Sequence, residues 1–116
     1  MQNAATSDQA PNSCCNGTPI GVITYSYRSF PCDAENLLKY VTQCGVSSIE
    51  LMSSTIEPFA GMPTGDDVDD AAVLAWRTSV SMEPFAALRK MFNDAGVNIH
   101  IAKFGDIGNP GMPDAQ

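Results

Sequence analysis

The sequence contains few basic residues and no cluster of them. Six lysines and arginines stand against 13 aspartates and glutamates, which gives a formal net charge of −7 at pH 7. Because the six bases are scattered along the chain, there is no basic patch for a phosphate backbone, and we do not expect nucleic acid as a partner. The negative charge also argues against a highly phosphorylated substrate, although a local arginine or lysine can override the global field.

Long hydrophobic runs are missing as well. Hydrophobic residues make up 44% of the 116-residue chain, but no apolar stretch approaches the roughly 18 residues that span a bilayer. The first residues show neither the basic start nor the apolar segment of a secretory signal. We therefore expect one globular domain, located in the cytoplasm and without contact to a membrane.

Metal-ligating residues are sparse. The chain has a single histidine, His100, and its four cysteines match no zinc-binding spacing. An even number of cysteines permits disulfides, but a chain with this apolar content does not need them, so we expect reduced thiols. The vicinal pair Cys14 and Cys15 is the only reactive candidate.

A group of four aspartates follows the middle of the chain and could suggest calcium: Asp66, Asp67, Asp69 and Asp70. Their spacing lacks the pattern of a calcium-binding loop and its bidentate terminal glutamate. We expect them to begin a short helix, where the positive end of the helix dipole favours carboxylates.

The chain divides into a polar leader and one structured region. Residues 1–17 are polar and without period, so we expect them to be disordered. The stretch PIGVITYSY then predicts a largely buried strand. Asp33 predicts the start of an amphipathic helix that ends before Gly45, and VSSIELM follows as a second strand.

The same pattern of a helix followed by a strand occurs a second time. Ser81 is expected to cap a helix that ends at Gly96, with Pro84 tolerated in its first turn, and VNIHIAKF forms the third strand. The segment between the second strand and this helix is expected to be loop in its first half and a short helix in its second. Strand, helix and strand in succession predict parallel pairing.

Five segments carry a resemblance to a known family. They are TPIGVITYSYRSFP, CGVSSIELM, EPFAGMP, WRTSVSMEPFAALRKMFNDAGV and IHIAKF, in this order between residues 18 and 104. Together they resemble the first three units of the xylose isomerase-like sugar phosphate isomerases and epimerases, which are (β/α)8 barrels. The resemblance implies an α/β fold in which residues 18–116 form the N-terminal portion of a TIM barrel, with three parallel strands and intervening helices.

The family resemblance also implies chemistry. Its members use a divalent metal, Mg, Mn or Zn, and the metal ligands are typically contributed by later strands. We therefore assign no metal ligand within this chain. The implied substrate is a sugar or polyol whose oxygens the metal polarises while side chains move a proton.

Glu50 is an acid within the β-prone run Val46 to Ser54. If Ile49 and Leu51 face the helices, Glu50 points to the barrel interior, late in its strand, where barrel enzymes keep their chemistry. There a carboxylate accepts hydrogen bonds from sugar hydroxyls. The alternative is a structural glutamate bonded to a polar group of a neighbouring strand.

Four further residues are candidates for substrate binding at the rim. Tyr25 and Arg28 are expected at the carboxyl end of the first strand, and His100 and Lys103 near that of the third. If Ile99 and Ile101 face the helices, His100 faces inward, but Lys103 then faces outward unless the strand bulges or ends. The alternative for His100 is a hydrogen-bonded core residue, and Trp76 is expected to serve packing.

Two functions of different class remain open. The first is the N-terminal fragment of a sugar phosphate isomerase or epimerase, inactive on its own because the catalytic residues lie beyond Gln116. The second is a self-contained α/β module that binds a ligand or partner without catalysis. For the fragment, the uncovered sheet face is expected to promote self-association.

Overall fold

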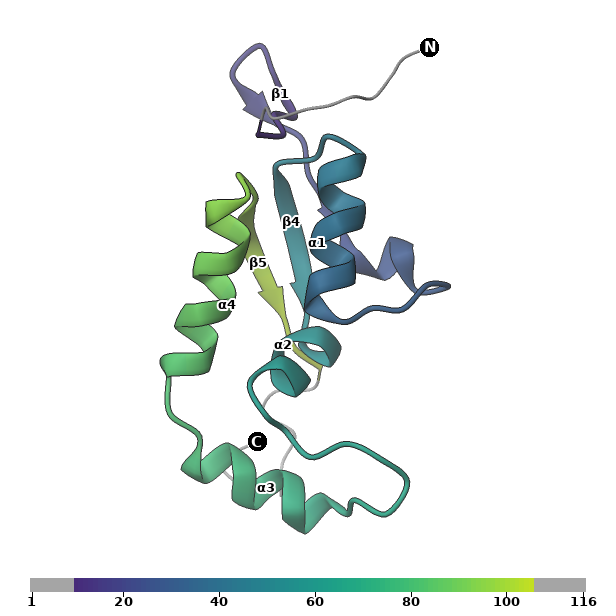
Figure 1. Ribbon diagram of the computed structural model, residues 1–116, viewed down its shortest axis with the longest axis vertical. Helices are drawn as coiled ribbons and strands as arrows, with labels where there is room; N and C mark the ends of the chain where they lie inside the picture. The colour runs from purple at the N-terminus through teal and green to yellow at the C-terminus, as the bar shows by residue number, and fades with distance from the viewer. Residues whose placement is uncertain (1–9, 106–116) are drawn as a thin grey trace.

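The computed structural model describes residues 10–105 and has a mixed α/β architecture. Three parallel strands form a sheet in the order β3-β4-β5: Val22–Ile23, Ser48–Met52 and Asn98–Lys103. Helix α1, Ala34–Gln43, connects β3 to β4, and helix α4, Glu83–Asp94, leads into β5 (Figure 1). The predicted parallel pairing of three strands with intervening helices is therefore confirmed.

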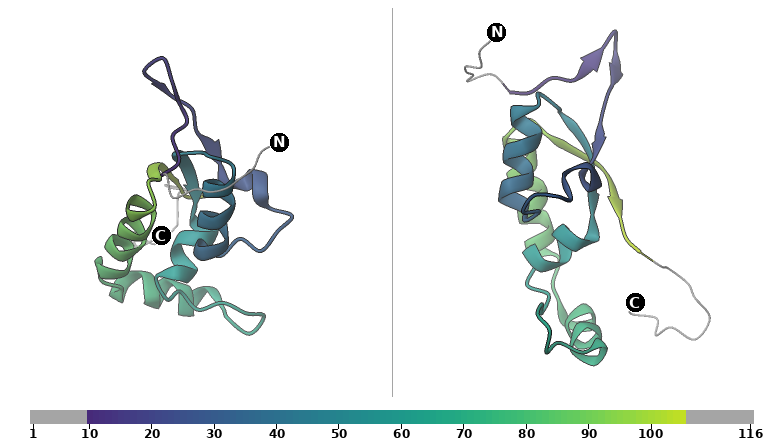
Figure 2. Two further views of the ribbon diagram at one scale, coloured as in Figure 1. Left: turned by 45° about the horizontal axis from the view of Figure 1, so that its top comes forward. Right: turned by 90° about the vertical axis from the view of Figure 1, so that its right-hand side faces the viewer.

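The helices lie on one side of the sheet. Viewed along the sheet edge, α1, α2 and α4 are on one face and the other face is bare within residues 10–105 (Figure 2, right). The core lies between these layers and contains fully buried side chains from both, namely Leu37, Val41, Ile49, Leu51, Phe92 and Val97. An amphipathic helix and a strand with one apolar face bury those faces against each other.

Helix α1 forms as its end signals predict. Asp33 accepts a hydrogen bond from the Asn36 backbone N–H at 3.0 Å, which satisfies one of the free donors of the first turn. Gly45 has φ of 74°, the left-handed conformation that ends many helices.

Helix α4 begins later than predicted. Its N-cap is Met82 rather than Ser81, and no side chain caps it. If Ser81 were the N-cap, one of the two backbone N–H groups available to its hydroxyl would belong to Pro84, which has none. The helix nevertheless ends as expected before Gly96, which has φ of 84°.

The segment between β4 and α4 contains two helices. Helix α2, Ser53–Phe59, follows β4 directly, where a loop was expected, and it includes Pro58. Helix α3, Asp70–Ser79, is capped by Asp69, whose carboxylate accepts from the Ala72 N–H at 2.9 Å. Asp69 and Asp70 thus stand at a helix start as predicted, whereas Asp66 and Asp67 lie in the turn before it.

The first strand is much shorter than predicted. It ends at Ile23, and Thr24–Tyr27 forms a 3-10 helix, η1. Buried Thr24 accepts a hydrogen bond from the Met52 N–H at 3.3 Å, so a side chain rather than the backbone continues the bonding to β4. The chain therefore leaves the sheet two residues after it joins it.

The expected disorder of residues 1–17 differs from the structure over residues 10–17, and residues 1–9 lie outside the described part. Cys14–Cys15 (β1) pairs antiparallel with Thr18–Pro19 (β2) around a turn at Asn16 and Gly17. Both turn residues have positive φ, 51° and 81°, the conformation of a tight hairpin turn that Asn-Gly favours. The polar composition of residues 1–17 led to a prediction of disorder, although the Asn16-Gly17 pair is typical of a hairpin turn.

Candidate functional site on the open face of the sheet

The side chains of strand β4 alternate between the two faces of the sheet, as predicted. Ile49 and Leu51 are 1% and 0% exposed and pack against the helices, whereas Glu50 between them is half-buried on the opposite face. Glu50 is the third of five residues, so it lies in the middle of its strand rather than late in it. Glu50 therefore faces away from the helices, as the alternation predicted, but its expected position at the carboxyl end of the strand is wrong.

A β-bulge at His100 reverses the alternation of β5. Ile49 is paired with Ile99, but the next residue, Glu50, is paired with Ile101. His100 is the extra residue. From Ile101 onward, each side chain therefore lies on the opposite face of the sheet from the one it would occupy without the bulge. The prediction that Ile101 faces the helices is therefore wrong.

The bulge settles the direction of Lys103. Lys103 is the register partner of Met52, and Met52 shares its face of the sheet with Glu50. Lys103 therefore belongs to the open face, where it is exposed. Without the extra residue at His100 it would face the helices.

A hollow of about 360 Å³ lies over this face and contains two of the five predicted site residues, Glu50 and His100. Its other walls include Gly21, Ile23, Ser48 and Ile101. A side chain at position 21 would place its Cβ 2.8 Å from the Ser48 carbonyl oxygen, so glycine permits the close approach of the two backbones here. The hollow therefore sits over the first half of the strands.

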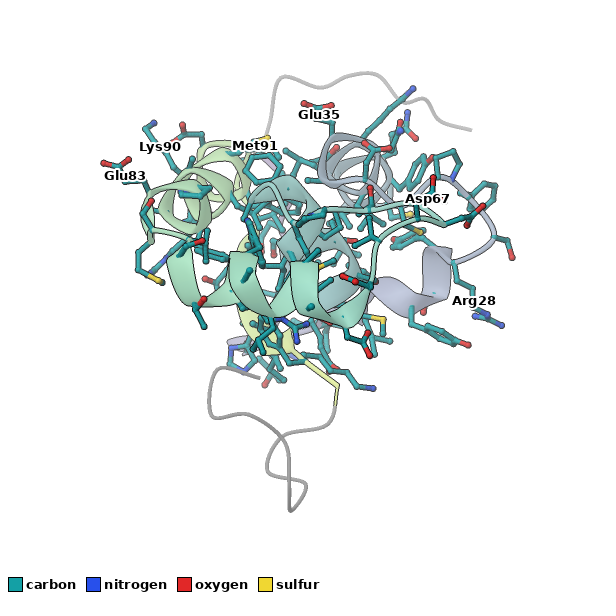
Figure 3. The ribbon with its side chains drawn as sticks, turned by 90° about the horizontal axis from the view of Figure 1, so that it is seen from below. Arg28, Glu35, Asp67, Glu83, Lys90 and Met91 are labelled. Atoms are coloured by element: carbon teal, nitrogen blue, oxygen red, sulfur yellow. The ribbon has the colours of Figure 1, made fainter. Side chains whose placement is uncertain are left out.

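Tyr25 and Arg28 lie apart from this hollow. Both belong to the 3-10 region, and the Arg28 guanidinium carbon stands 4.6 Å from the centroid of the Tyr25 ring. Arg28 also donates to the Tyr25 carbonyl at 3.2 Å and points outward (Figure 3). Neither residue lines the hollow, because the chain leaves the sheet after Ile23.

An ion pair between a buried glutamate and a partly exposed arginine is a feature that the sequence pattern did not reveal. Glu57 in α2 receives two hydrogen bonds from Arg77 in α3, from Nε to Oε1 at 2.7 Å and from Nη2 to Oε2 at 3.0 Å. The pair holds the pKa of Arg77 above its ordinary value through the hydrogen bond to Glu57, against the effect of burial. No periodicity connects these positions, which are 20 residues apart in sequence.

The described residues do not assemble a metal centre. Within residues 10–105, no three His, Cys, Asp or Glu side chains lie close enough to hold an ion together. The four cysteines are unpaired thiols, and Cys14 and Cys15 are exposed. In the same part of the chain, no helix combines the length and apolar character that crossing a bilayer requires.

Comparisons of the chain with models of protein families, with curated proteins and with solved structures gave no match. The fold is thus described by its own geometry, as an α/β arrangement with a three-stranded parallel sheet.

Proposed function

We propose that the chain supplies three consecutive βα units to a barrel of the xylose isomerase-like kind, and that the open face of its sheet is the interior wall that meets a sugar or polyol. The observation that carries the proposal is the asymmetry of the sheet. Helices cover one face, while Glu50, His100 and Lys103 gather on the other. Parallel sheets of α/β proteins are covered on both faces, and a barrel closes the second face on itself.

The three side chains suit a polyhydroxylated ligand. A carboxylate accepts hydrogen bonds, an ammonium group donates them, and an imidazole does both, so neighbouring hydroxyls of one sugar find complementary partners. The divalent metal that such isomerases use does not fit the described residues, which hold no ligand cluster. In this proposal these residues orient and bind the substrate, and other units of the barrel hold the metal.

Amide chemical-shift mapping tests the proposal. Titration of the isotope-labelled chain with a pentose, a hexose and a polyol should shift amides of β4 and β5 around Glu50 and His100. The variant Glu50→Gln should reduce these shifts, whereas Glu83→Gln should preserve them, because Glu83 is exposed and points outward from α4 (Figure 3). Equal binding by both variants, or unchanged spectra at saturating sugar, would contradict a sugar-binding face.

A second candidate is a partner-binding module, and the partner that fits is another copy of this chain. The open face carries Ile101, which is 47% exposed on an edge strand, and such edges and apolar faces promote association. Light scattering after size-exclusion chromatography should find dimers that Ile101→Lys converts to monomers. A wild-type monomer at all concentrations would remove this candidate.

A further inference from the structure

A second and larger cavity lies on the other side of the sheet from Glu50. It occupies about 870 Å³ between α2, α3, α4 and the helix-facing side of β4 and β5. Most of its walls are apolar and include Leu51, Ile56, Trp76, Val80, Phe85 and Leu88. Its size and its apolar lining are those of a site for a small organic molecule.

The aromatic wall of this cavity is formed by two helices that meet only loosely. The rings of Trp76 in α3 and Phe85 in α4 are tilted at 55°, with centroids 6.4 Å apart. Helix α3 has no fully buried residue, and Trp76 and Val80 are only half-buried. Apolar surface therefore remains in contact with water, and a ligand that covers it gains free energy from removing that surface from water.

Charged groups in the lining have an excess of positive charge. Glu57 and Arg77 neutralise each other through their two hydrogen bonds, and Arg89 adds a second guanidinium. One carboxylate against two guanidiniums leaves a local charge of +1 in a chain whose formal net charge is −7. An acidic protein thus carries a positive group beside this apolar cavity.

The positions of the two arginines define where an anion would bind. Arg89 follows Phe85 by one helical turn, so both side chains lie on the face of α4 that lines the cavity. Arg77 uses Nε and Nη2 for Glu57, and among the described residues Nη1 remains for another acceptor. Glu57, whose side chain is only 9% exposed, holds the Arg77 guanidinium in place.

We propose that this cavity is a binding site for an amphipathic organic anion, a carboxylate with an aromatic or branched aliphatic body. The body packs between Trp76 and Phe85, and the carboxylate meets Arg89 and the outer edge of Arg77. A sugar does not suit these walls, because buried hydroxyls without partners are costly. An organic cation is disfavoured by the excess positive charge. The site is independent of the proposed sugar-binding face, which lies across the sheet.

The chain contains a built-in reporter for the test. Trp76 is its single tryptophan and lines the cavity, so its fluorescence responds to a ligand there. The full chain would be titrated with 3-phenylpropanoate and, as a neutral match of the same shape, with 3-phenylpropan-1-ol. We expect saturable quenching or a spectral shift with the acid, at an affinity at least about tenfold higher than with the alcohol, since hydrogen bonds to charged groups are the strong ones.

Two variants separate the proposed contact from a general charge effect. Arg89→Gln should weaken binding of the acid about tenfold or more and leave binding of the alcohol unchanged. Lys90→Gln removes the same charge from the next residue, which lies outside the lining, points away from the cavity and pairs with Asp94 at 2.6 Å (Figure 3). Its affinity for the acid should equal that of the wild type.

Three results would overturn the proposal. The first is equal affinity for acid and alcohol, which would leave an apolar cavity without anion selectivity. The second is an Arg89→Gln variant that binds the acid as tightly as the wild type does. The third is the absence of any Trp76 response to either compound at millimolar concentration, which would mean that the cavity is closed or filled by other parts of the protein.

Discussion

Ser13 and Ser47 exchange hydrogen bonds in both directions across 34 residues of sequence. The Ser13 N–H donates to the Ser47 hydroxyl oxygen, and the Ser47 N–H donates to that of Ser13, each at 2.9 Å. The Ser13 hydroxyl also donates to the Ile20 carbonyl at 2.6 Å. The N-terminal hairpin is thus fastened to the residue that immediately precedes β4.

Replacing Ser13 by alanine should therefore destabilise the domain. The change leaves the Ser47 N–H and the Ile20 carbonyl without this partner, and we expect a loss of about 1–2 kcal/mol in the free energy of unfolding. Urea denaturation of Ser13→Ala measures it, with exposed Ser29→Ala as the control. If both variants unfold at the same urea concentration, the hairpin does not contribute to stability, as the composition of residues 1–17 first indicated.

Gly96→Ala should cost more than Gly45→Ala. Both glycines have positive φ, 84° and 74°, so alanine brings a backbone strain of about 1–2 kcal/mol at either position. A Cβ at position 96 would also lie 2.8 Å from the Cβ of Ala10, whereas one at position 45 would meet no atom within 4 Å. Thermal unfolding of the two variants isolates this contact.

The control for this comparison is the double variant Ala10→Gly with Gly96→Ala. Removal of the Ala10 methyl group should recover much of the excess loss, while the contact with Pro11 Cδ at 3.1 Å and the backbone strain remain. Equal melting temperatures for Gly96→Ala and Gly45→Ala would mean that residues 10 and 11 do not pack against this turn.

Arg77→Met should destabilise the protein by about 2–3 kcal/mol. The variant removes the hydrogen-bond donors of a carboxylate that is 9% exposed, and uncompensated buried charges are costly. The Arg77 side chain is 28% exposed, so we expect a smaller loss than the roughly 3–5 kcal/mol of fully buried pairs. Chemical denaturation provides the measurement.

Replacement of both residues, Glu57→Leu with Arg77→Met, should restore most of this stability. Two apolar side chains of similar volume can be buried without any hydrogen-bond or charge partner. A double variant as unstable as Arg77→Met alone would show that the two residues act separately.

Stability should decrease at alkaline pH because of Tyr27. Burial, helped by its hydrogen bond to the Cys44 thiol at 3.6 Å, raises the pKa of Tyr27 from 10.0 to about 12. A group whose pKa is higher in the folded state contributes stability below its unfolded pKa and loses it as pH rises through the folded value, here between about 10 and 12. Denaturation at several pH values should show this slope.

Tyr27→Phe supplies the matched control. The ring remains in contact with Tyr40, whose ring centroid is 5.7 Å away in the wild type, but the titrating hydroxyl is gone. The alkaline decline between pH 10 and 12 should then become smaller. An unchanged decline would assign the effect to other groups.

Most signals that act within one element were interpreted correctly from the sequence, the Ser81 cap and the Asn16-Gly17 turn being the exceptions. The Asp33 cap, the glycines at 45 and 96 and the burial of Ile49 and Leu51 each depend on neighbours within a few residues. Such signals follow from backbone conformation and from the alternation of a half-buried strand. They were sufficient for α1, α3, most of α4, the parallel pairing and the direction of Glu50, but not for α2.

Features that depend on distant partners were missed. The β-prone residues Thr24–Tyr27 form a 3-10 helix, and the Thr24 hydroxyl, in place of a backbone carbonyl, accepts the hydrogen bond of the Met52 N–H. The partnership of Glu57 and Arg77 and the anchoring of Ser13 by Ser47 arise in the same way, between segments that the chain brings together only on folding. Propensity describes a residue in isolation and cannot specify such contacts.

The residues of the open face were predicted only in part, because their positions also depend on contacts between distant segments. Glu50 and His100 line one hollow, yet Tyr25 and Arg28 do not join them because their segment had already left the sheet. Lys103 lies on the open face only because of the β-bulge at His100, and nothing in the residues NIHIAK predicts that bulge.

That bulge has a consequence for how β5 tolerates change in its length. Because His100 is one residue more than the pairing needs, deleting it would restore even pairing and would transfer Lys103 to the helix side, beside the larger cavity. Inserting a residue elsewhere in the strand would likewise move every side chain after the insertion to the opposite face of the sheet. Substitutions on β5 thus alter single contacts, whereas a change of one residue in length moves a charge from one proposed site to the other.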